Sequence, residues 1–86
     1  MFPYKVNLEH RRIGEIRDFD CLSQVESLCL RNNMIRNVQN VLTLTNLTEL
    51  DLYDNLIKKI ENIETLVNLE ILDFRFRVQF FIFGSF

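Results

Sequence analysis

The sequence predicts an α/β fold: a short curved solenoid with parallel strands on the concave face and short helical or 3₁₀ segments on the convex side. Three observations support this prediction: a 22-residue internal repeat, leucines spaced by two within each copy, and a later apolar spacing of three. A spacing of two is the period of a strand with one buried face, and a spacing of three fits a helical or 3₁₀ segment. One copy cannot bury its own apolar row, so the copies must stack and share a core.

The repeat becomes visible when the sequence is shifted by 22 residues. Eight positions then agree in chemical type: Leu28 with Leu50, Leu30 with Leu52, Asn33 with Asn55, Ile35 with Ile57, Val38 with Ile60, Val41 with Ile63, Leu44 with Leu66 and Leu47 with Leu69. One copy earlier the apolar set persists with Arg11 at the asparagine position, and one copy later the pattern stops near Phe74. We therefore expect an N-terminal tail at 1–5, repeats over 6–74 and an atypical apolar tail at 75–86. The repeats divide into a degenerate first unit at 6–27, units at 28–49 and 50–71, and the start of another at 72.

Each repeat is expected to turn at an asparagine once its strand has ended. Asn33 and Asn55 occupy this position, where a side-chain amide can bond backbone groups of adjoining turns. Stacked copies should then form an asparagine ladder. Further along each copy, Asp18, Asn40 and Asn62 are in register and are predicted to be the N-caps of the short helical segments.

The composition narrows the classes of function. A hydrophobic fraction of 48% with 26% charged residues fits a soluble globular chain and no membrane-spanning segment, and a net charge of −2 gives no broad positive field for nucleic acid. The two cysteines, Cys21 and Cys29, match no usual disulfide framework or zinc spacing, which indicates reduced thiols in an intracellular protein. The sequence contains no grouping of serine, histidine and acid and no glycine-rich nucleotide loop. We therefore expect neither catalysis nor a small-molecule substrate. We expect a non-enzymatic protein without a metal or another cofactor.

The candidate binding residues flank the buried strand leucines. Because alternate side chains of a strand point to opposite faces, these flanking residues project into the concave face. Tyr53 and Arg31 are the strongest candidates, since both types are enriched as interface anchors. The acidic positions could pair with basic residues of a partner. The full candidate set is Cys29, Arg31, Glu49, Asp51, Tyr53 and Asp73.

The strings L-C-L-R-N-N-M-I-R-N-V-Q-N-V-L-T-L-T-N-L at 28–47 and L-D-L-Y-D-N-L-I-K-K-I-E-N-I-E-T-L-V-N-L at 50–69 resemble 22-residue leucine-rich repeats. More narrowly, R-I-G-E-I at 12–16, S-L-C-L-R at 27–31 and E-L-D-L-Y-D-N at 49–55, followed by I-K-K-I-E-N, resemble the family of protein phosphatase 1 regulatory subunit 7. The resemblance covers roughly Val6 to Phe74. It implies a protein of the nucleus and cytoplasm that binds the catalytic subunit of protein phosphatase 1 through the concave face.

Two other interpretations remain open at the level of the sequence. The chain could be a structural or assembly adaptor for another protein complex, or a truncated product without binding activity of its own. Residues 75–86, which include the uncharged apolar run Phe80 to Phe83, could cap the last repeat or form an aggregation-prone segment.

Overall fold

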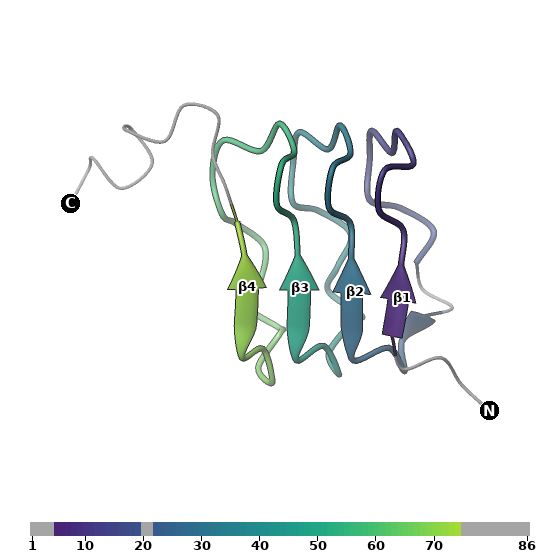
Figure 1. Ribbon diagram of the computed structural model, residues 1–86. Helices are drawn as coiled ribbons and strands as arrows, with labels where there is room; N and C mark the ends of the chain where they lie inside the picture. The colour runs from purple at the N-terminus through teal and green to yellow at the C-terminus, as the bar shows by residue number, and fades with distance from the viewer. Residues whose placement is uncertain (1–4, 20–21, 75–86) are drawn as a thin grey trace.

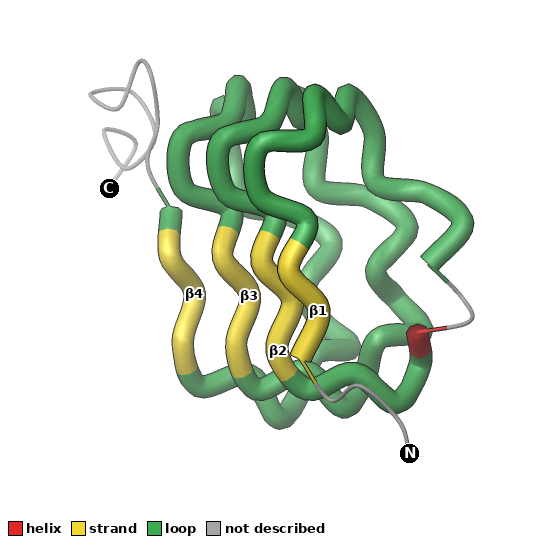
Figure 2. Tube along the Cα trace, turned by 45° about the vertical axis from the view of Figure 1, so that its right-hand side comes forward, coloured by secondary structure: helices red, strands yellow, loops and turns green. Residues whose placement is uncertain are grey.

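The computed structural model describes residues 5–19 and 22–74, and the tail predicted at 75–86 lies outside these residues. Within the described part, four strands form one parallel sheet in chain order (Figure 1). These are β1 (Lys5–Asn7), β2 (Ser27–Cys29), β3 (Glu49–Asp51) and β4 (Ile71–Asp73). Each of β1, β2 and β3 is followed by a return path behind the sheet, so the chain winds as a coil with the strands along one side (Figure 2). The predicted solenoid of stacked repeats is confirmed.

The register of the sheet repeats the 22-residue shift seen in the sequence. Val6 lies opposite Leu28, Leu28 opposite Leu50, and Leu50 opposite Leu72. The central residue of each strand therefore belongs to one column that runs through the core. Leu28 and Leu50 have no exposed surface, while their neighbours in sequence on β2 and β3 are partly exposed. The two-residue spacing thus sorts side chains between core and surface as the sequence predicts.

The core is one continuous cluster built from the repeated positions of neighbouring copies. The second of the paired leucines is buried in the same way, and so are the isoleucine and valine that follow the turn. The members are Ile16, Val25, Leu28, Leu30, Ile35, Val38, Val41, Leu44, Leu47, Leu50, Leu52, Ile57 and Leu66. Since no copy contains enough of these residues to enclose a core alone, burial depends on the neighbours.

The asparagine ladder is present. Asn33 Oδ1 accepts hydrogen bonds from the backbone N–H groups of Arg11 and Ile13 in the preceding repeat, both at 2.9 Å. Its Nδ2 donates to Leu8 O at 3.0 Å and to Leu30 O at 2.9 Å. This buried side chain therefore joins two repeats through backbone groups that have no sheet partner at the turn.

Asn55 makes three corresponding bonds one repeat later. Its Oδ1 accepts from Ile35 N at 3.0 Å, and its Nδ2 donates to Leu30 O at 2.9 Å and Leu52 O at 3.1 Å. Each ladder asparagine thus satisfies the backbone of its own repeat and of the repeat before it.

The side behind the sheet consists mainly of consecutive turns. In the second repeat Leu44 N donates to Val41 O and Leu47 N donates to Leu44 O, and the third repeat makes the equivalent bonds three residues apart. These are 3₁₀-type bonds, so the spacing of three indicates single turns in series. Among the described residues of this side, only Leu22 has a helical conformation, of the 3₁₀ type (Figure 2).

The predicted N-cap role of Asn40 and Asn62 is wrong. An N-cap side chain accepts from a helical N–H with the backbone in the extended region. Here both residues have a left-handed backbone, with φ of 60° and 61°. Their Nδ2 groups instead donate to Ile16 O and Val38 O of the preceding repeat, each at 2.7 Å. Asp18, the third predicted N-cap, also has a left-handed backbone, with φ of 62°.

A second left-handed position lies three residues after the end of each of the first three strands, at His10, Asn32 and Asp54, with φ of 60°, 59° and 60°. Asparagine and aspartate adopt this region more readily than other residues with a side chain. The polar Asx residues of the repeat therefore serve two purposes, to turn the backbone and to bond the neighbouring copy.

Candidate protein-binding face

The outer side of the sheet presents a group of charged and aromatic side chains that we call the strand face. It comprises the six predicted candidates, Cys29, Arg31, Glu49, Asp51, Tyr53 and Asp73. The 22-residue frame puts Cys29, Asp51 and Asp73 in one column, because each is the last residue of its strand. Arg31 and Tyr53 form a second column two residues further on.

Asp51 is the centre of this group. Its side chain is only 15% exposed, and Oδ2 accepts from Arg31 Nε at 2.9 Å. Its Oδ1 accepts from the backbone N–H of Tyr53 at 3.0 Å. Because one carboxylate oxygen bonds the backbone and the other bonds a guanidinium, the position of Asp51 is fixed from two sides.

Arg31 extends across three repeats. Besides its bond to Asp51, its guanidinium lies 4.0 Å from Asp73 Oδ2 and 4.8 Å from the centre of the Tyr53 ring. The distance to the ring is within the range of a cation–π contact. The hydrogen bond from Arg31 to Asp51 is the main cause that raises the pKa of Arg31, so the guanidinium stays charged. The structure therefore joins Arg31, Asp51, Tyr53 and Asp73 in one cluster.

The other two candidates lie at its margin. Cys29 Sγ is 3.9 Å from Asp51 Oδ2, which is a weak contact. Glu49 accepts a hydrogen bond from Ser27 Oγ at 3.2 Å and so pairs with a residue outside the cluster. The predicted list is thus divided into a connected set of five residues and one neighbouring acid.

The internal pairing of Arg31 with Asp51 was not anticipated from the sequence, which suggested these acids as partners for basic residues of another protein. The sequence nevertheless contains features that favour this pairing. Residues 31 and 51 lie in adjacent repeats and in neighbouring columns of the 22-residue frame, and they carry opposite charges. Opposite charges on adjacent strands attract across the sheet.

Cys29 is expected to react slowly with an alkylating reagent. Burial is the main cause that raises the pKa of its thiol, and the nearby Asp51 and Glu9 act in the same direction. A raised pKa means less thiolate at a given pH, so alkylation by iodoacetamide at pH 8 should be slower in the folded chain than in urea, and should accelerate as the pH rises. Mass spectrometry of the Cys21→Ser variant measures this site alone. Equal rates in the folded and unfolded chain would contradict the expectation.

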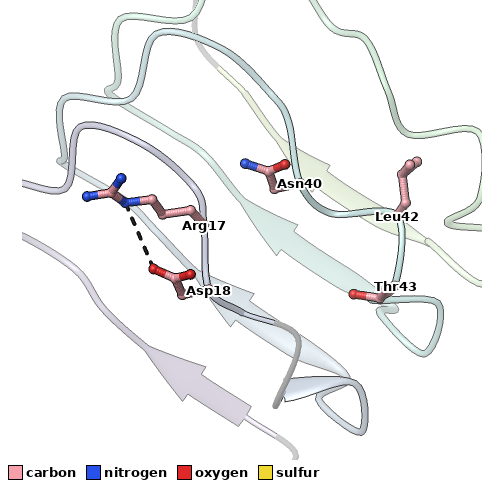
Figure 3. A pocket seen from close by; sticks show the side chains of 5 residues that line it. All are labelled: Arg17, Asp18, Asn40, Leu42 and Thr43. Atoms are coloured by element: carbon pink, nitrogen blue, oxygen red, sulfur yellow. Dashed lines mark ion pairs between the residues drawn. The ribbon is translucent and has the colours of Figure 1, made fainter.

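A shallow hollow of about 400 Å³ lies between the first two repeats, away from the strand face (Figure 3). Its lining is Arg17, Asp18, Asn40, Leu42 and Thr43. Arg17 and Asp18 form an ion pair of 3.9 Å, with side chains that are 69% and 91% exposed. Pairs this exposed are worth about 0 to 1 kcal/mol. The lining combines no nucleophile with a buried base, so the strand face remains the better candidate site.

A sequence profile described as "Leucine Rich repeats (2 copies)" matches residues 23–65 and 45–79, which together are more than half of the chain. The chain belongs to the leucine-rich repeat family. This agrees with the column of leucines and the asparagine ladder, both of which come from the repeated positions. No helix in the ranges 5–19 and 22–74 of this leucine-rich repeat chain has the length and hydropathy to cross a bilayer.

The leucine-rich repeat chain is also similar to curated proteins named protein phosphatase 1 regulatory subunit 7. It is 55% identical to the one from Homo sapiens over 36 residues, which are 42% of this chain and 10% of the relative. It is 52% identical to the one from Xenopus tropicalis over 43 residues, which are 46% of this chain and 12% of the relative. The matched region thus spans about a tenth of the length of these relatives. The resemblance to this kind of leucine-rich repeat protein is confirmed.

Proposed function

We propose that the chain is a non-enzymatic protein-binding module that contacts the catalytic subunit of protein phosphatase 1 through the strand face. The observation that carries the proposal is the ordered cluster of Arg31, Asp51, Tyr53 and Asp73 in a chain similar to regulatory subunits of that phosphatase. Membership of the leucine-rich repeat family favours protein binding over catalysis. Within the cells that make it, the protein would act in the nucleus and the cytoplasm.

The cluster has properties suited to an interface. Tyrosine and arginine are enriched among the residues that dominate binding energy. Here both are held in place before a partner arrives, since Arg31 is bonded to Asp51 and lies over the Tyr53 ring. Side chains that are ordered in advance lose less conformational entropy on association. Asp73, with a side chain 48% exposed, stays accessible to a basic group of the partner.

Capture of the purified phosphatase catalytic subunit by the immobilised chain tests this proposal. Wild-type chain should retain the phosphatase, while Tyr53→Ala and Asp51→Lys should each weaken binding by about tenfold or more, the effect of losing a central interface residue. Glu64→Lys is the matched control for Asp51→Lys, because it makes the same charge change at an exposed position behind the sheet. Circular dichroism should show that all variants retain the wild-type fold.

Two results would contradict the proposal. If the wild-type chain does not capture the phosphatase, the chain does not bind this partner. If capture occurs but neither strand-face substitution weakens it more than Glu64→Lys does, the contact lies elsewhere on the molecule.

A further inference from the structure

The core of the solenoid is less completely covered at its C-terminal end than between the inner repeats. In the second repeat the valines and leucines that follow the turn are wholly buried, because the third repeat covers them. Three of their four counterparts 22 residues later are only partly buried, while the fourth, Leu66, is 5% exposed. The partly buried residues are Ile60, Ile63 and Leu69, joined by Leu72 of β4 and by Phe74, which follows β4. Within the described residues β4 is the last strand of the sheet (Figure 1), so these partly buried apolar residues lie at the β4 end of the core.

Backbone N–H and C=O groups at this end indicate that a partner would need polar groups as well as an apolar surface. In the inner repeats, Ile13 N and Ile35 N donate to the ladder asparagine of the following repeat. Leu8 O and Leu30 O accept from the Nδ2 of the same asparagine. The counterparts at the end of the stack are Ile57 N–H and Leu52 C=O. This pair fits a carboxamide, which both accepts and donates.

A second carboxamide position lies close by. Ile16 O and Val38 O each accept from an asparagine of the following repeat, Asn40 and Asn62, at 2.7 Å. The counterpart at the end of the stack is Ile60 C=O. A repeat that continues the stack therefore needs two asparagines seven residues apart, as at Asn33 and Asn40.

Neither this chain nor a second copy of it supplies that pair at the matching positions. In the 22-residue frame the next two positions hold Arg77 and Gly84. The N-terminal repeat of a second copy would offer Arg11 and Asp18. An arginine side chain only donates hydrogen bonds, an ionised aspartate only accepts them, and glycine has no side chain.

We propose that the C-terminal end of the solenoid is a docking surface for a leucine-rich repeat of another polypeptide with the pattern L-x-L-x-x-N followed seven residues later by a second asparagine. The docking repeat adds a parallel strand to the outer edge of β4 and covers the partly buried apolar residues. Its two carboxamides bond the backbone groups of Leu52, Ile57 and Ile60. This surface is separate from the strand face, so the two proposals can fail independently.

A labelled synthetic peptide with the sequence of residues 28–49 is a suitable probe, because it carries both asparagines in the required spacing. Fluorescence anisotropy with the full chain should show saturable binding. The matched control is the same peptide with Asn33→Leu and Asn40→Leu, which should bind at least tenfold more weakly. The control is more apolar than the probe, so binding driven by hydrophobicity alone would rank the two peptides in the opposite order.

Two further measurements place the contact. Hydrogen exchange followed by NMR should show that the peptide protects the amide of Ile57 and leaves Arg31 and Tyr53 unchanged. In the chain, Ile63→Lys should abolish binding, whereas Val67→Lys, at a position 79% exposed, should not. The peptide variants keep the test decisive if Ile63→Lys fails to fold.

The proposal is overturned if neither peptide binds, if both bind equally, or if the protected amides lie on the strand face. It is also overturned if sedimentation shows self-association of the chain that prevents peptide binding, since a second copy would then cover this end.

Discussion

Replacing Asn55 with leucine should destabilise the chain by about 2 to 5 kcal/mol, because a buried unsatisfied backbone group costs about 1 to 3 kcal/mol and several are affected. The substitution removes the acceptor for Ile35 N and the donor to Leu30 O and Leu52 O. Asn55 is 1% exposed, so water cannot take its place without opening the stack. Small domains have a total stability of about 5 to 15 kcal/mol, so the variant should be close to unfolding. The measurement is urea denaturation followed by circular dichroism.

Asn46→Leu is the matched control for Asn55→Leu. Asn46 also bonds the preceding repeat, through one hydrogen bond of 2.9 Å to Ser23 O, but it is exposed and water can replace that bond. Its free energy of unfolding should fall by roughly 0.5 kcal/mol or less, as for most surface substitutions. Equal losses for the two variants would show that the ladder contributes nothing beyond an ordinary surface hydrogen bond.

Replacing Leu50 with alanine should lower the free energy of unfolding by about 2 to 5 kcal/mol, the range for buried leucine truncations. Leu50 has no exposed surface and lies between Leu28 and Leu72 in the central column of the sheet. A cavity there removes contacts in two directions, since the repeats on either side share this position. Thermal and urea denaturation of the purified variant both measure the loss.

Leu42→Ala is the control for Leu50→Ala, because it deletes the same atoms from a side chain that is 54% exposed. Its unfolding midpoint should stay close to that of the wild-type chain. If both leucine variants lose the same stability, Leu50 does not occupy the core column described above.

The sequence predicted the sheet well because the repeat itself fixes the register. A strand that slips by one residue would move its leucine to the surface, and every copy carries the same constraint at the same position. The repeat alone therefore predicts Leu28, Leu50 and Leu72 in one column and Asn33 and Asn55 in a ladder beside them. Both expectations are confirmed.

The roles of Asn40 and Asn62 were less predictable because an asparagine can act in several ways. Its side chain can cap a helix, turn the backbone or bond a distant carbonyl, and the spacing of three that follows suits a helix as well as successive turns. The choice depends on the repeat that lies alongside. Ile16 O and Val38 O are placed by tertiary structure to accept the Nδ2 groups, so the left-handed turn prevails over the cap.

For the candidate face, the sequence indicated which side chains point outward but not how they pair. Arg31 could have pointed into solvent or along the strand to a residue of its own repeat. Its contacts with Asp51, Tyr53 and Asp73 depend on the distance between strands and on the length of the arginine side chain, which together let one guanidinium reach two repeats onward.

Each ladder asparagine bonds the repeat that precedes it, and this has a consequence for how such a chain can change length over evolution. Duplication or loss of a whole 22-residue unit leaves every carboxamide opposite a suitable peptide group. A single inserted residue between one strand and its asparagine would displace that amide from both repeats it joins, whereas an insertion in an exposed turn near Val67 would leave the alignment of the columns intact. Gain or loss of complete 22-residue units is therefore the change in length that disrupts the fewest hydrogen bonds between repeats.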